Sequence, residues 1–126
     1  MVGTKQCSVV TLRSYSEFRR VFDTKARFFR NGLGFCYRRA NNILFRFGIS
    51  IPKRFGKAVE RNKLRRRIKE IIRHSSSVPC NSEIVFCVRK PCSEFSYECL
   101  KNICEWGFNK ISHTKISVEV VSSDEL

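Results

Sequence analysis

The segment from Lys57 to Arg73 constrains the fold most strongly, because its apolar and charged residues separate at the period of a helix. Four aliphatic side chains fall within one narrow arc: Leu64, Ile68, Ile71 and Ile72. Cationic and polar residues fan out beside that arc: Arg61, Asn62, Arg65, Arg66, Lys69 and Arg73. We predict a helix that docks one face on a core and presents a row of cations on the neighbouring face, as suits a phosphate backbone.

The positive charge is concentrated in the first part of the chain. The 126 residues carry a net charge of +14, with +8 in residues 1–52, +8 in residues 53–73 and −2 in residues 74–126. Solubility does not need charge of one sign gathered in this way, so a polyanionic partner is the better interpretation. The narrow aliphatic stripe has no Trp or Phe, and no stretch approaches a membrane span, so we expect no membrane partner and a cytoplasmic protein.

The pattern of the remaining segments predicts one α+β domain over residues 1–126. Ser14 and Glu17 form a capping box that opens a helix over residues 14–25. Alternation predicts strands over 33–37 and 43–51, and an apolar run predicts a strand over 84–88 that is covered on both faces. A last helix follows Ser96, with Gly107 as an awkward residue in it. Residues 115–121 are expected to form a short edge strand or an ordered tail.

The strand over residues 43–51 has two unlike faces. One face is wholly apolar, whereas the other consists of small, cationic or hydroxyl residues and could line a cleft. The seven cysteines show no C-x-x-C pair, so we expect reduced thiols that act as small hydrophobes. A zinc site is disfavoured because the spacing lacks the close pairs of structural zinc sites; its four candidate ligands are Cys87, Cys92, Cys99 and Cys104.

Three motifs in order resemble the protein subunit of bacterial ribonuclease P over about residues 12–113. The most specific runs from Phe47 to Arg67 and contains Gly-Ile-Ser-Ile, a basic pair, Gly-Lys-Ala-Val and Arg-Asn-Lys-Leu-Arg-Arg. The second is Val88-Arg89-Lys90-Pro91, and the third is Glu17-Phe18 with Val21-Phe22. Lys63 stands where the family usually has Arg, which keeps the charge but loses the two-pronged contact of a guanidinium group.

The resemblance implies a fold and a division of labour. The fold would be a small mixed sheet with three helices and a left-handed βαβ crossover. The protein would bind a catalytic RNA and the 5′ leader of precursor tRNA, so that an endoribonuclease holoenzyme matures the tRNA 5′ end. The RNA subunit would carry the catalytic centre and hold most of the Mg²⁺, with no catalytic residue, metal or cofactor belonging to the protein alone.

The resemblance also implies two sets of binding residues. Residues facing the catalytic RNA would be Lys53, Arg54, Lys57, Arg61, Asn62, Lys63, Arg65, Arg66, Lys69, Arg89 and Lys90. A cleft for the single-stranded leader would be lined by Phe18, Phe22, Tyr37, Arg46 and Ser50. Rings that stack on bases and cations that follow the backbone are what single-stranded RNA requires, although Phe at helical spacing is equally compatible with plain core.

Two other functions compete with this interpretation. A ribosomal or other structural RNA-binding protein would have the same composition, and only the ordered motifs argue against it. A nuclease acting without RNA is disfavoured, because metal-dependent cleavage uses clustered carboxylates and Glu60 and Glu70 lie about 15 Å apart along one predicted helix. The two histidines, His74 and His113, are expected at helix ends as ordinary surface residues.

Overall fold

The computed structural model describes residues 8–40 and 44–113 of the chain. The strands are β1 (Val9–Thr11), β2 (Arg27–Arg30), β3 (Leu33–Arg39), β4 (Phe45–Ser50) and β5 (Ser82–Val88). The helices are α1 (Tyr15–Phe22), α2 (Ala58–His74) and α3 (Tyr97–His113), with short 3-10 turns η1 (Lys53–Phe55) and η2 (Cys92–Glu94). No helix in this described part is long and apolar enough to cross a membrane.

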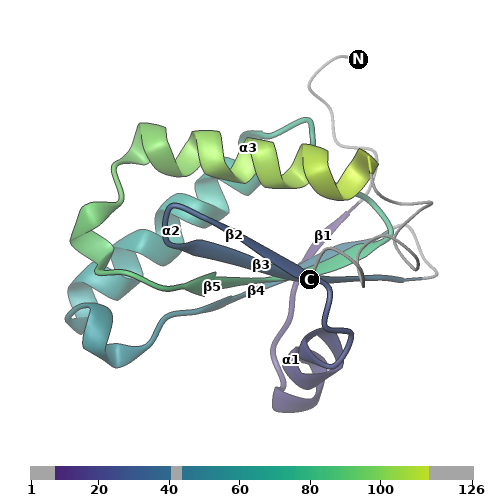
Figure 1. Cartoon of the computed structure of the whole chain (residues 1–126), viewed down its shortest axis with the longest axis horizontal. Helices are drawn as coiled ribbons and strands as arrows, with labels where there is room; N and C mark the ends of the chain where they lie inside the picture. Colours follow the sequence, from purple (N-terminus) through teal and green to yellow (C-terminus); the bar gives the residue numbers. More distant parts are fainter. Residues whose placement is uncertain (1–7, 41–43, 114–126) are drawn as a thin grey trace.

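The strands form one mixed sheet in the order β1-β4-β5-β3-β2. The pairs β1–β4 and β4–β5 are parallel, and the pairs β5–β3 and β3–β2 are antiparallel. Helices α2 and α3 cover one face of the sheet, and α1 crosses the other face (Figure 1). This arrangement is the predicted α+β architecture with three helices.

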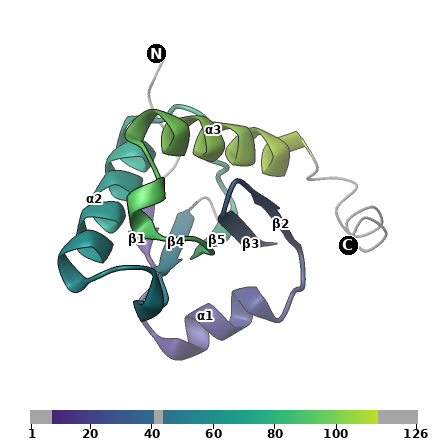
Figure 2. The same ribbon diagram turned by 60° about the vertical axis from the view of Figure 1, so that its left-hand side comes forward.

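The connection from β4 through α2 to β5 joins two parallel neighbours. In Figure 2 these strands run toward the viewer, with α2 on the upper left and β5 to the right of β4. The crossover is therefore left-handed, against the usual right-handed rule and in agreement with the resemblance.

The two faces of the sheet carry cores of unequal size. The larger core lies under α2 and α3 and contains the fully buried rings of Phe35, Phe45, Phe86 and Phe108. The smaller core lies under α1 and consists of Leu12, Val21, Cys36 and Val85, with Phe18, Phe22 and Cys87 packed against it. One short helix cannot cover a whole sheet face, so part of the α1 side stays accessible.

Several predicted boundaries differ from the structure. The helix predicted over 14–25 ends at Phe22, and the strand predicted to begin at residue 84 begins at Ser82 because it pairs with both neighbours from there. Strands β1 and β2 were not predicted, since neither is long enough to show a period. Ile43 and the predicted segment 115–121 lie outside the described residues.

The four cysteines considered as zinc ligands in the sequence analysis do not come together in the structure. Cys87 packs on the α1 side, whereas Cys92 and Cys104 belong to the core under α2 and α3. In the described ranges no three His, Cys, Asp or Glu residues gather to hold a metal ion. The expectation of reduced thiols fits five cysteines but is wrong for Cys80, which is disulfide-bonded.

Candidate nucleic-acid interface

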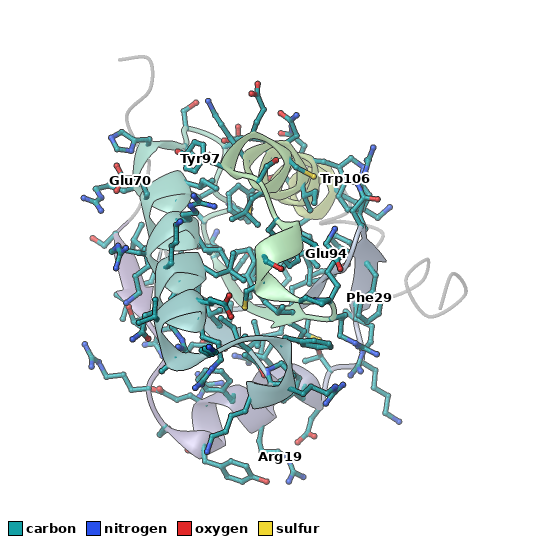
Figure 3. The ribbon with its side chains drawn as sticks, turned by 90° about the vertical axis from the view of Figure 1, so that its left-hand side faces the viewer. Arg19, Phe29, Glu70, Glu94, Tyr97 and Trp106 are labelled. Carbon is teal, nitrogen blue, oxygen red and sulfur yellow. The ribbon has the colours of Figure 1, made fainter. Side chains whose placement is uncertain are left out.

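Helix α2 is anchored as its sequence pattern predicts. Its buried side chains are Leu64, Ile68, Ile71 and Ile72, the four residues of the predicted apolar arc. At its start, the backbone N–H of Lys57 donates to Oε1 of Glu60 at 2.8 Å, which satisfies one of the unpaired donors of a helix N-terminus. The opposite side of α2 lies along one flank of the molecule, where its side chains extend outward (Figure 3).

Three cations line up along the accessible side of α2. Arg61, Arg65 and Lys69 are four residues apart and therefore lie on one helix face. The Nε of Arg61 donates to the carbonyl of Gly56 at 3.1 Å, and Nη1 of Arg65 donates to Oδ1 of Asn62 at 3.2 Å. Both contacts orient a guanidinium group without neutralising it.

In the described part of the chain, no ion pair joins an acidic side chain to Arg61, Arg65 or Lys69. Within the described ranges, the carboxylate of Glu70 forms the ion pair of α2 with Arg73 at the end of the helix, and it also lies 3.5 Å from Nδ1 of His74. Glu60 is engaged by the backbone of Lys57. The other predicted RNA-facing residues of this region are exposed: Lys53, Arg54, Lys57, Asn62, Lys63 and Arg66. The guanidinium of Arg54 lies over the Phe55 ring at 4.6 Å.

A second surface lies between α1 and the sheet. The hydroxyl of Ser14 accepts from the backbone N–H of Glu17, and the Glu17 carboxylate accepts from the backbone N–H groups of Arg13 and Ser14. These two backbone hydrogen bonds lower the pKa of Glu17 and confirm the predicted capping box. The cap fixes the first turn of α1 and with it the direction of the Phe18 and Phe22 rings.

Phe18 and Phe22 both pack on the sheet and stay partly accessible. Their ring centroids are 6.5 Å apart. Phe18 lies directly over Gly48 of β4, where an added Cβ would come within 2.4 Å of the ring. The absence of a side chain at Gly48 therefore sets how closely α1 approaches the sheet. These two residues lie between α1 and the sheet and are packed against the smaller core, and their contact with a leader stays a prediction.

A buried carboxylate ties α1 to the sheet. Glu83 of β5 is 2% exposed and accepts from Arg20 of α1 through two hydrogen bonds of 3.2 and 2.8 Å. Arg38 and Arg46 lie opposite it on the neighbouring strands, at 2.9 and 3.7 Å. The sequence placed Arg46 on the cleft face, and it lies there, but part of its charge is used by Glu83. One carboxylate among three guanidinium groups leaves this cluster positive.

The prediction for Tyr37 is wrong, because its side chain lies on the opposite face of the sheet. Tyr37 is 4% exposed, belongs to the core under α2 and α3, and has its ring 5.7 Å from that of Phe28. Alternation along β3 instead directs Cys36 to the α1 side. Ser50 remains a candidate, since it shares the Gly48 side of β4 and lies opposite Cys87.

Phe29 is a candidate stacking residue that the sequence reasoning missed. It lies opposite Gly34 of β3 and covers that glycine, on the face that carries α1. Phe29 is 46% exposed, and the guanidinium of Arg89 lies 4.8 Å from the centroid of its ring. The sequence offered no period-two signal here, because Arg27-Phe28-Phe29-Arg30 is four residues long and its two Phe are adjacent. Lys90, the partner of Arg89 in the predicted basic pair, lies over the ring of Phe95 at 4.7 Å.

Two thiols lie in the same face. The Sγ atoms of Cys36 and Cys87 are 3.7 Å apart. The hydrogen bond from Cys87 lowers the pKa of Cys36 to about 7, and the nearby charges of Arg27 and Arg89 act in the same direction. The same contact raises the pKa of Cys87, so Cys36 is the more acidic thiol of the pair.

The described residues do not fit a Mg²⁺ site of the protein's own. Glu83 is paired with arginines, Glu60 caps α2, and no group of three potential ligands comes together in the part of the chain that the structure describes. What this arrangement can do chemically is bind: a row of uncompensated cations meets phosphates, and exposed rings beside guanidinium groups meet unpaired bases.

Comparison with known proteins points to one family. A family model described as Ribonuclease P matches residues 8–112. The Ribonuclease P protein component of Phytoplasma australiense is 34% identical over 92 residues, which cover 71% of this chain and 80% of that protein. The Mycoplasma mobile protein of the same name is 35% identical over 79 residues, covering 63% of this chain and 69% of that protein.

Solved structures share the fold. The RNase P protein of Staphylococcus aureus superposes with a TM-score of 0.68 at 26% identity, covering 81% of this chain and 94% of that chain. The RNase P protein of Thermotoga maritima superposes with a TM-score of 0.70 over 82% and 96% of the two chains. Its identity is 24%, so that likeness concerns the fold alone.

Proposed function

The chain belongs to the ribonuclease P protein family, and from that premise we propose that it binds a catalytic RNA through α2 and the 5′ leader of precursor tRNA through the α1 cleft. Members of this family are protein components of an endoribonuclease. In the proposed holoenzyme, the RNA subunit carries out the cleavage and holds the Mg²⁺ ions. The protein contributes binding energy and orientation, and no step is assigned to a catalytic side chain of its own.

The row formed by Arg61, Arg65 and Lys69 is the observation that carries the proposal. A rigid helix with a buried aliphatic face holds the three cations at fixed separations, and the carboxylates of α2 are engaged elsewhere. Fixed cations release counterions from a polynucleotide with little ordering of the protein. The exposed basic residues of η1 extend this surface toward the end of β4.

The α1 cleft supports the second half of the proposal. Phe18, Phe22 and Phe29 offer rings on one face of the sheet, and Arg89 brings a cation to the Phe29 ring. Single-stranded RNA needs both kinds of group, because its bases stack on aromatic rings and its phosphates form ion pairs with cations. Mature tRNA has no leader, so contacts in this cleft would favour the precursor over the product.

The test compares the affinity of the reconstituted holoenzyme for a precursor tRNA and for the mature tRNA. Phe29→Ala should weaken binding of the precursor by about tenfold, the value of one lost base stack, and leave mature tRNA binding unchanged. Tyr97→Ala is the matched control, since Tyr97 is 40% exposed at the start of α3, on the α3 side of the sheet (Figure 3). Equal weakening for both RNAs would argue against leader binding in the cleft. A protein that binds the RNA but does not help cleavage would instead fit a structural RNA-binding role.

A further inference from the structure

We propose that a pocket between β2 and α3 is a separate RNA site, which takes one unpaired nucleotide with its base stacked on Arg30 above Trp106. This inference rests on the proposed function, because it assumes that the natural ligand is RNA. It concerns a part of the surface that neither α2 nor the α1 cleft includes. In Figure 3 Trp106 lies on the same flank as β2, and α2 lies on the opposite flank.

The pocket has the size and the lining of a nucleotide site. Its volume is about 570 Å³, and it lies between the end of β2 and the first half of α3. Arg30 at the end of β2 and Asn31 in the β2–β3 turn line it from one side, and Asn102 and Trp106 line it from α3. A guanidinium group can meet a phosphate or a base face, and an amide can hydrogen-bond the edge of a base. Glu98 is the one carboxylate in the lining, and it lies in the first turn of α3, where a helix stabilises negative charge.

Arg30 already lies over the Trp106 ring without a ligand. The guanidinium of Arg30 lies 4.7 Å from the Trp106 ring centroid. The indole is held from below by Phe28, whose ring meets it edge-on with centroids 5.3 Å apart. Arg30 is exposed, so its guanidinium group is accessible to a base from solvent. A guanidinium group that is already ordered on an indole loses little freedom when a base stacks on it.

Charge and continuity favour RNA as the occupant. The β2–β3 turn connects this pocket with Arg89 and Lys90, because the backbone N–H of Arg89 donates to the carbonyl of Gly32 at 2.8 Å and the Lys90 side chain lies against Gly32. Strand β2 places Phe29 under Arg89 on the α1 face and Arg30 over Trp106 on the α3 face. Lys110 adds a further cation 5.9 Å from the Trp106 ring. A single-stranded RNA bound in the α1 cleft can therefore continue around the β2 edge of the sheet into this pocket.

The chain provides its own probe for this site, since Trp106 is its single tryptophan. We would titrate the full chain with a dye-labelled eight-nucleotide oligoadenylate and record dye anisotropy and tryptophan fluorescence in the same samples. Anisotropy reports binding anywhere on the protein, whereas quenching of Trp106 reports a base at the pocket. The variant Arg30→Gln removes the stack, and Lys101→Gln removes an exposed cation from α3 that does not line the pocket. Thermal melting of each variant establishes that it is folded.

The proposal predicts that oligoadenylate quenches Trp106, that Arg30→Gln reduces the quenching at least fivefold, and that Lys101→Gln leaves it unchanged. Binding by anisotropy without quenching would overturn the proposal, and so would equal quenching in Arg30→Gln. If the protein did not bind RNA at all, the proposed function itself would fail, and neither the anisotropy nor the Trp106 fluorescence would change with oligoadenylate. The source of the nucleotide is decided by two further arms: quenching by the catalytic RNA alone assigns the pocket to that RNA, and quenching only by a precursor with a long leader assigns it to the leader.

Discussion

Arg20 of α1 and Glu83 of β5 form a two-hydrogen-bond ion pair that fixes the only helix on its side of the sheet among the described residues. Glu83 is buried, and its loss would leave the charges of Arg38 and Arg46 without their partner. Breaking a buried pair in this way destabilises a protein by about 3–5 kcal/mol. We expect Glu83→Gln to lower the free energy of unfolding by about 3 kcal/mol. This value is at the lower end of the range because the arginines are partly solvated.

Denaturant unfolding measures this effect, with Glu70→Gln as the matched control. The Glu70–Arg73 pair lies on the surface, with both side chains about half exposed or more, so its loss should change stability by less than about 1 kcal/mol. Equal effects of the two substitutions would show that Glu83 does not hold α1 in place.

The row of cations on α2 predicts a steep dependence of RNA affinity on salt. Each phosphate that is neutralised contributes about 0.7–0.9 to the slope of log affinity against log salt concentration. Replacing Arg65 and Arg66 together with Ala should reduce the slope for the catalytic RNA by up to about two units. Filter binding at several salt concentrations measures it, and Lys101→Ala on α3 should leave the slope as it is. A slope that does not change in the double variant would remove these two residues from the interface.

Gly107 should not tolerate the replacement that usually strengthens a helix. In an ordinary helix interior, Ala in place of Gly stabilises by about 1 kcal/mol. In α3, however, a Cβ at residue 107 would lie 2.4 Å from the buried Phe35 ring. We expect Gly107→Ala to destabilise the protein by about 1–3 kcal/mol through overpacking, as measured by thermal or denaturant unfolding. A rise in stability would mean that Phe35 can move aside.

The thiol pair predicts a titration near neutral pH. The pKa of Cys36 is lowered to about 7, mainly by the hydrogen bond from Cys87, against an ordinary value of 9.0. A lowered pKa means that the thiolate contributes stability above the ordinary pKa, and that this contribution is lost as the pH falls through about 7. Thiolate ultraviolet absorbance, recorded against Cys36→Ala, should show this midpoint, and Cys87→Ala should move it upward. If the midpoint were the same with Cys87 and with Cys87→Ala, the hydrogen bond from Cys87 would not be the cause of the lowered pKa.

The sequence predicted those parts of the fold whose periods are long enough to show. The aliphatic arc of α2 and the alternation in β4 identify the buried faces correctly. Strand β2 was missed because four residues are too few to show an alternation, and the strand is defined by its pairing with β3. Missing β2 also hid Phe29, the exposed ring beside Arg89.

The differences between the predicted and the observed site have two separate causes. Tyr37 was assigned to the cleft by resemblance, although its alternation with Cys36 placed it with Phe35 on the core side. The position of Glu83 among three arginines depends on the register of β3, β4 and β5, and strand register between distant segments cannot be read from one sequence. The RNA contacts of the α2 residues remain a prediction.

The most direct test of the whole account is the cleavage rate of a leader-bearing precursor tRNA by a bacterial ribonuclease P RNA at low Mg²⁺, with and without this protein. The account predicts that the protein raises the rate, that the combined Arg61→Ala and Arg65→Ala substitutions abolish most of the gain, and that the protein alone cleaves nothing. No gain at low Mg²⁺ would contradict the account, and so would cleavage by the purified protein without the RNA.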